Sequence, residues 1–128
     1  MLLLNRRRML DYTEKNIILI KSDALEQGTL RIDNGNILKS NYRVRTKDFI
    51  NLEKGRYKIT CNGAIQGNVL EYDGNKTFRK THFHVHTKFP LYITIQWSSV
   101  KISVSNGAEG SVNITPPDVK YIKIEKIE

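Results

Sequence analysis

The amino-acid sequence predicts an all-β fold, an antiparallel β-sandwich of the jelly-roll kind with a short N-terminal arm. The chain consists largely of short runs rich in Val, Ile, Thr and Tyr, which strands favour. Polar and apolar residues alternate within these runs, as from Arg56 to Cys61, which is typical of strands with one buried face. Turn residues separate the runs roughly every 8–12 residues, a spacing typical of sandwiches and barrels. The length of 128 residues fits a single domain.

The first half of the predicted sandwich contains four strands. They are residues 16–21, 30–32, 37–45 and 56–61. Asn34-Gly35 predicts a hairpin between the second and third strands, because this dipeptide tolerates positive φ. Gly55 marks the turn before the fourth strand.

The second half continues the same pattern to the end of the chain. The predicted strands are residues 69–72, one or two strands within 78–88, then 91–97, 100–104, 112–115 and 121–127. Asp73-Gly74-Asn75 predicts a tight turn after the first of them. Pro116-Pro117 separates the last two.

Residues 1–15 are predicted to form the arm and residues 16–128 the sandwich. The arm is predicted to attach the protein to a larger assembly through Leu2, Leu3, Leu4, Arg6, Arg7, Arg8, Met9 and Leu10. Apolar side chains would enter a neighbour's groove while the arginines pair with carboxylates at its rim. Two alternatives remain: the arm packs back on its own sandwich, or it forms a short helix. Deleting residues 1–12 should then leave a folded domain that no longer joins the assembly.

The remaining bulk properties restrict the classes of partner. The apolar stretch precedes the arginines, the reverse of a secretory signal, and no apolar run approaches the roughly 20 residues of a membrane span. The net charge of +8 raises the question of nucleic acid, but most basic residues alternate singly, as Arg43 and Arg45 do. That alternation is typical of a solvated sheet face and argues against nucleic acid as a partner.

Cys61, the only cysteine, shares the parity of Ile59 and is predicted to face the core.

The order of several short motifs is informative. The sequence reads Leu-Glu-Gln-Gly-Thr at 25–29, Asn-Gly at 34–35, Tyr-Arg-Val-Arg-Thr at 42–46, Asp-Phe-Ile at 48–50, Lys-Gly at 54–55 and Tyr-Lys-Ile-Thr at 57–60. A strand, an Asp-containing turn and Phe78 follow, and a Pro-containing segment precedes the last strand. This order resembles a module of bacteriophage minor structural and tail-tip proteins. Leu25 stands where that family has an aromatic residue, and residues 82–104 have no counterpart in its pattern.

The resemblance implies a carbohydrate-binding-like jelly roll in a virion structural protein, with no enzymatic activity and no cofactor. Such a protein would be a decoration, fibre or tail-associated module, assembled in the host cytoplasm. Its partners would be other virion proteins and further copies of itself. The opening residues 5–10 resemble the start of structural proteins from phages of Bacteroides-type gut bacteria. The alternative function is a carbohydrate-binding module that contacts host surface glycans.

Three histidines alternate in the predicted strand 78–88. His82, His84 and His86 would share one face, where imidazoles can bind Zn²⁺, Ni²⁺ or Fe²⁺. Residues four apart on a strand are separated by about 13–14 Å, so one chain cannot bring all three to one ion. A metal site would therefore span a subunit interface. The alternative is a polar sheet face with Phe83 and Val85 turned inward.

The glycan-binding alternative depends on aromatic and polar side chains near two turns. The candidates are Trp97, Tyr72, Asp73 and Asn75. Trp97 has the parity of Ile93 and Ile95, so a core position is the competing interpretation.

Signatures of catalysis are absent from the sequence. It contains no Gly-x-Ser-x-Gly, no phosphate-binding glycine loop and no His-Glu-x-x-His. Glu71 and Asp73 flank Tyr72 and could form a carboxylate pair, but an acid at the position of Asp73 is typical of turn chemistry.

Overall fold

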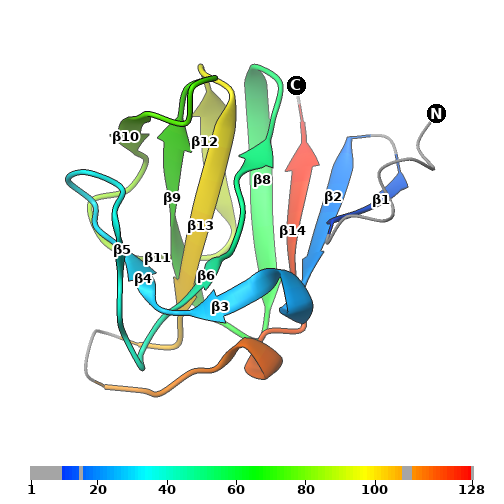
Figure 1. Cartoon of the computed structure of the whole chain (residues 1–128). Coiled ribbons are helices and arrows are strands. Elements are labelled where there is room, and N and C mark those ends of the chain that lie inside the picture. The colour runs from blue at the N-terminus through cyan, green and yellow to red at the C-terminus, as the bar shows by residue number, and fades with distance from the viewer. Residues whose placement is uncertain (1–9, 15, 108–110, 128) are drawn as a thin grey trace.

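The computed structural model describes residues 10–14, 16–107 and 111–127, and it confirms the predicted all-β sandwich. A five-stranded and a seven-stranded antiparallel sheet pack against each other, and a small two-stranded hairpin lies beside them (Figure 1). Successive strands from β8 to β14 pass repeatedly between the two large sheets. Among the described residues, none of the helices has the length and apolar character that crossing a membrane requires.

The five-stranded sheet has the order β1-β2-β14-β8-β12. Its strands are β1 (Leu10–Glu14), β2 (Ile17–Lys21), β8 (Gly55–Asn62), β12 (Leu91–Ile95) and β14 (Tyr121–Lys126). The C-terminal strand β14 lies between β2 and β8 and pairs with both. The two ends of the described chain are therefore joined in one sheet.

The seven-stranded sheet has the order β10-β9-β13-β6-β3, with β11 also paired to β9 and β7 to β13. Its strands are β3 (Leu25–Gln27), β6 (Val44–Thr46), β7 (Ile50–Asn51), β9 (Gln66–Tyr72), β10 (Phe78–Thr81), β11 (Thr87–Lys88) and β13 (Ser99–Ser105). β9 and β13 form its centre, with seven residue pairs in register from Gln66–Ser105 to Tyr72–Ser99.

The core lies between the two large sheets and follows the predicted alternation. In β12, Leu91, Ile93 and Ile95 are buried while Tyr92 and Thr94 are exposed. The partly buried Cys61 packs against this core as predicted, and burial raises its pKa to about 11.

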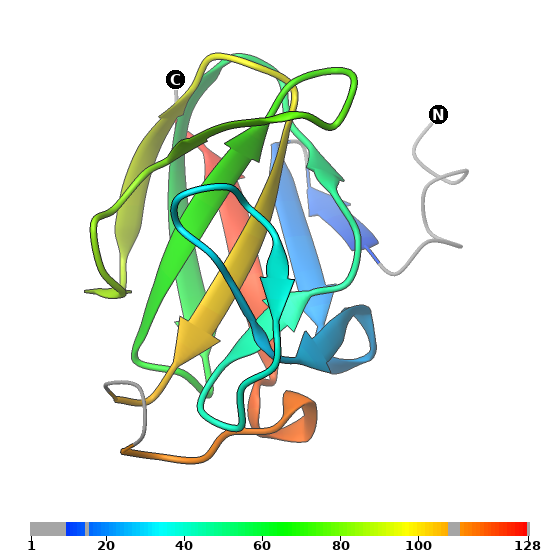
Figure 2. The same ribbon diagram turned by 60° about the vertical axis from the view of Figure 1, so that its left-hand side comes forward.

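A hairpin covers part of the outer face of the seven-stranded sheet. Strands β4 (Thr29–Leu30) and β5 (Ile37–Leu38) form it, and its loop lies across β9 and β13 (Figure 2). Leu30 packs there with Leu70 and Tyr72 in a second apolar cluster, to which Phe49 and Phe78 also belong. Two single-turn 3-10 helices, η2 (Ser22–Ala24) and η3 (Pro116–Asp118), lie at one end of the sandwich.

Four sequence-based expectations differ from the structure. The predicted strand 37–45 is two strands in different sheets, β5 and β6, separated by residues 39–43. Residues 10–14 were assigned to the arm and not to the sandwich, yet they form β1, because Leu10 and Asp11 pair in register with Ile20 and Leu19. Residues 112–115 form no strand; the backbone N–H of Ile114 bonds to Asn41 in a connecting segment instead. Residues 82–86 also form no strand, since β10 ends at Thr81 and β11 begins at Thr87.

Candidate functional site

The segment 82–88 carries the three histidines and is fixed to β9, between the places where β10 and β11 pair with that strand. The backbone N–H of His82 donates to the carbonyl of Val69. The side chain of Asn68 donates to the carbonyl of Phe83 and accepts its N–H, at 2.8 and 3.1 Å. Asn68 is 1% exposed, so these two bonds satisfy an amide that is otherwise removed from water.

His82 contacts the most deeply buried acid of the described chain. Its Nε2 lies 2.7 Å from Oε1 of Glu71, whose side chain has no exposed surface. Oε2 of Glu71 accepts the backbone N–H groups of Gln96 and Trp97 at 2.7 and 2.5 Å. Burial lowers the pKa of His82, and the hydrogen bond to Glu71 opposes this effect. The arrangement joins β9, the histidine segment and the β12–β13 connection.

His86 lies on the outer face of the seven-stranded sheet, away from His82. Its Nδ1 and Nε2 each lie 2.8 Å from a serine hydroxyl, those of Ser105 and Ser103. Burial, together with the charge of Arg43, lowers the pKa of His86 to about 3. The imidazole is therefore neutral in the folded protein at neutral pH.

His84, in contrast, is exposed. It lines an open pocket of about 250 Å³ together with Ile32, Asp33, Thr81 and Phe83. The three histidines thus have three different environments and do not share a face, because residues 82–86 lack the regular alternation of a strand. Among the residues that the structure describes, no three His, Cys, Asp or Glu side chains are grouped as metal ligands.

Tyr72, a glycan-binding candidate, is buried in the structure. The residue is 4% exposed and its hydroxyl donates to the carbonyl of Gly35 on the hairpin. Its ring makes edge-on contacts with Phe49 and Phe78, with centroids 4.9 and 5.9 Å apart. Burial raises its pKa to about 12. A sugar ring cannot stack on a tyrosine covered in this way.

The other glycan candidates stabilise a turn or lie partly covered. Oδ1 of Asp73 accepts the backbone N–H groups of Asn75 and Thr77, so this acid performs turn chemistry. The partly buried Trp97 carries the guanidinium of Arg79 over its ring, 5.1 Å from the centroid. Cation–π contact of this kind occupies one face of the indole.

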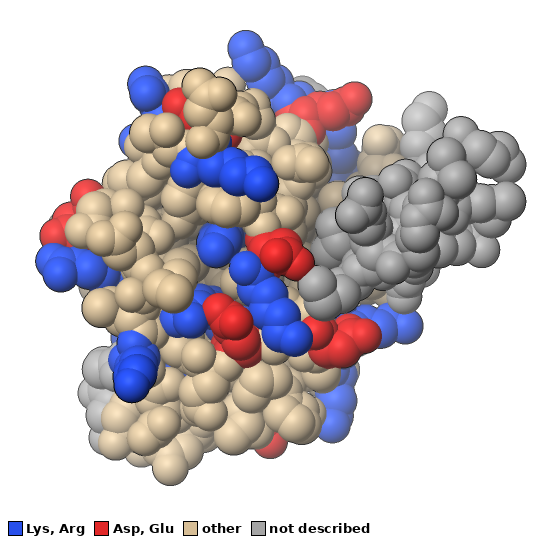
Figure 3. Space-filling view, in the orientation of Figure 1, with Lys and Arg blue, Asp and Glu red and all other residues tan. Residues whose placement is uncertain are grey.

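Sequence reasoning missed a buried arginine. Arg45, predicted on a solvated face, is 8% exposed, because the β4–β5 hairpin covers it. Its Nε donates to Glu26 at 2.7 Å, and its Nη1 donates to the carbonyls of Thr29 and Leu38. Gly28 is the residue in the sequence that relates to this buried position. Its φ is +134°, and a Cβ there would lie 2.2 Å from Nη1 of Arg45. Basic and acidic side chains are interleaved on this side of the molecule (Figure 3).

Of the proposed attachment residues, the structure describes only Leu10. Leu2, Leu3, Leu4, Arg6, Arg7, Arg8 and Met9 lie outside the described residues. The backbone of Leu10 belongs to β1.

No protein-family model matches this chain, and no curated protein or solved structure matches it either.

Proposed function

We propose that this chain is a non-enzymatic structural component of a bacteriophage virion, a decoration, fibre or tail-associated module attached through its N-terminal residues. The order of motifs between residues 25 and 80 supports the proposal through its resemblance to phage tail-tip modules. The β-sandwich is the fold that this resemblance implies.

The observation that carries the proposal is how the buried ionisable side chains are used. Glu71, His82, His86 and Arg45 each bond to partners within their own chain. Such groups are the usual source of acid–base chemistry in an enzyme, where they face a substrate cavity. Here they tie strands to the segments that cover them, which is the use expected in a scaffold.

The carbohydrate-binding alternative has weaker support. Its best aromatic candidate, Tyr72, is closed off by the hairpin. The remaining aromatic candidate, Trp97, is partly buried and has Arg79 over one face of its ring. A glycan array probed with the full chain distinguishes the two functions, because a purely structural module gives no saturable signal.

Truncation tests the attachment hypothesis. The structure shows that the deletion should end before Leu10. Because β1 begins at Leu10, removing residues 1–12 would also remove part of a paired strand. Removal of residues 1–9 leaves β1 intact. The shortened chain should keep a β-type circular dichroism spectrum and fail to enter particles assembled with the other virion proteins.

A matched variant separates charge from length. Replacing Arg6, Arg7 and Arg8 by Ser in the full chain keeps the length and the apolar residues but removes the proposed pairing with carboxylates. Incorporation of this variant should fall as salt-sensitive contacts are lost. Normal incorporation of the chain that lacks residues 1–9 contradicts attachment through this segment. Absence of the full chain from purified particles contradicts the virion role itself.

A further inference from the structure

The edge strands of the two large sheets differ in charge. These strands are β1 and β12 in the five-stranded sheet, and β10, β11, β3 and β7 in the seven-stranded sheet. β1 contains Asp11 and Glu14, β10 contains Arg79 and Lys80, and β3 contains Glu26. β12, which reads Leu-Tyr-Ile-Thr-Ile, contains no charged residue. Charges on an edge strand discourage pairing with another chain. β7 is also uncharged but consists only of Ile50–Asn51, so β12, with five residues, is the long edge that lacks this protection.

The backbone of β12 is paired on one side. Its five residues pair in register with β8, from Leu91–Ile59 to Ile95–Gly55. Within the described part of the chain, no other segment hydrogen-bonds to the opposite side of residues 91–95. The exposed side chain of Tyr92, at 54%, stands on the outer surface beside this open edge.

We propose that β12 pairs antiparallel with β12 of a second copy of the chain, so that two five-stranded sheets become one continuous sheet. With the twofold axis at Ile93, Leu91 of one copy lies opposite Ile95 of the other, and Tyr92 lies opposite Thr94. Inward positions then meet inward positions and outward positions meet outward ones, as the alternation in β12 requires. Aromatic and β-branched residues are favourable cross-strand partners.

Two chains that each carry +8 repel each other overall, so a contact between copies must keep basic side chains apart. The pairing brings only neutral side chains into direct opposition. The nearest basic residues on the outer face are Lys58 and Arg56, which lie one strand further in, opposite Tyr92 and Thr94. Across the joined edge they are three strand spacings apart, about 14 Å, which exceeds the Debye length of about 8 Å at physiological salt. The pairing goes beyond the proposed virion role and does not depend on it.

The test measures mass by analytical ultracentrifugation of the full chain over a range of concentrations. The wild-type chain should form a dimer reversibly. Thr94→Lys places a charge on the exposed side of the edge and should weaken the dimer by about tenfold or more. Thr94→Val, which keeps the β-branched shape without charge, should dimerise like the wild type. Thr77→Lys adds the same charge in the exposed β9–β10 turn and should also dimerise normally.

A second measurement uses the wild-type chain alone. Amide hydrogen exchange of residues 91–95 should slow as protein concentration rises, whereas that of the edge strand β10 should not change. A wild-type chain that stays monomeric overturns the proposal. So does a dimer that Thr94→Lys leaves intact, or exchange in β12 that is independent of concentration.

Discussion

Nε2 of His82 lies 2.7 Å from Oε1 of Glu71, a carboxylate with no exposed surface. The other oxygen of Glu71 accepts two backbone N–H groups from the connection between β12 and β13. One side chain of β9 therefore holds the connection through which the chain passes from the five-stranded to the seven-stranded sheet. The contact has a structural role, and its contribution to the free energy of unfolding can be measured.

Removal of the Glu71 carboxylate should be strongly destabilising. Glu71→Ala leaves two buried N–H groups without an acceptor, and each such group typically costs about 1–3 kcal/mol. Glu71→Gln keeps one acceptor oxygen and should lose roughly 1.5–3 kcal/mol of charge-assisted bonding. Urea denaturation followed by circular dichroism gives both values.

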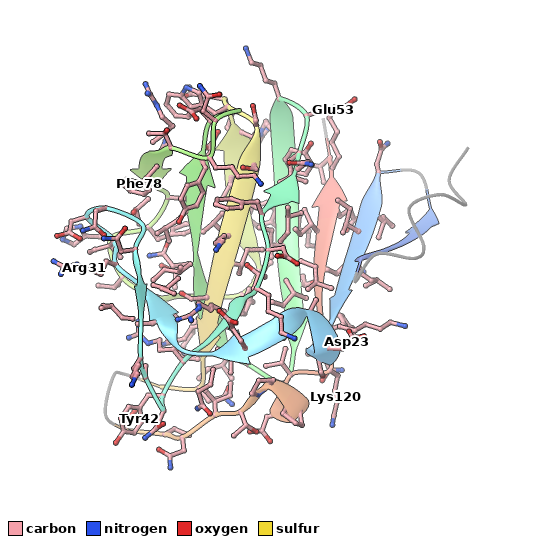
Figure 4. All side chains as sticks on the ribbon, viewed as in Figure 1. Asp23, Arg31, Tyr42, Glu53, Phe78 and Lys120 are labelled. Carbon is pink, nitrogen blue, oxygen red and sulfur yellow. The ribbon has the colours of Figure 1, made fainter. Side chains whose placement is uncertain are left out.

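The matched control is Glu53→Gln. Glu53 accepts a hydrogen bond from Lys126 at 3.0 Å but its side chain is 83% exposed, and it lies just before the start of β8 (Figure 4). This change should alter the free energy of unfolding by at most about 1 kcal/mol. Equal effects at Glu53 and Glu71 would contradict the role assigned to burial.

Stability should fall as pH decreases, in part because of His86. The pKa of His86 is about 3 in the folded protein against 6.5 for a free imidazole, so the unfolded chain binds the proton first. The free energy of unfolding is then highest above pH 6.5 and decreases as pH falls toward about 3, by up to about 1.4 kcal/mol per pH unit. His82, whose pKa is also lowered, adds to the same slope.

Denaturant unfolding at several pH values in this window isolates the contribution of His86. His86→Gln keeps hydrogen-bonding capacity toward Ser103 and Ser105 and should flatten the slope. His84→Gln changes an exposed histidine of the same segment and should leave the slope as in the wild type. If both variants keep the full slope, other groups dominate the pH dependence.

Gly63 should tolerate no side chain. Its φ is +108°, and a Cβ there would lie 2.1 Å from the carbonyl oxygen of Asp118, a backbone atom beside η3. Gly63→Ala should therefore lower the melting temperature, by an amount corresponding to roughly 1–3 kcal/mol or more. At Gly74 the nearest atom is 3.7 Å away and φ is not positive, so Gly74→Ala should be neutral or stabilising by up to about 1 kcal/mol. Calorimetry of the two variants provides the comparison.

Arg45→Lys should loosen the β4–β5 hairpin without unfolding the sandwich. A lysine ammonium cannot reproduce the fork that reaches Glu26 and two hairpin carbonyls. Amides in the hairpin should exchange faster while those of β9 and β13 remain protected. Arg31→Lys is the control within the same hairpin, since Arg31 projects into solvent (Figure 4) and pairs only with the exposed Asp33 among the described residues. Equal exchange in the two variants would contradict a fastening role for Arg45.

The strands were predictable because their signals are local. Alternation in Arg56 to Cys61 and the turns at Asn34-Gly35 and Asp73-Gly74-Asn75 act between neighbouring residues, and each corresponds to a strand or turn in the structure. The histidine segment was misread as a strand. Its path is set by Asn68 and Glu71, which lie more than ten residues earlier in the chain, so no local pattern records it.

The sequence by itself determined the fold class and most of the inward positions, because a period of two fixes which side chains share a face. Only the tertiary structure decided which outward positions meet water. Tyr72 and Arg45 point away from the main core, yet both are buried, because the hairpin from a separate part of the chain covers them. Coverage of this kind depends on contacts between distant segments, and alternation along a single strand carries no information about it.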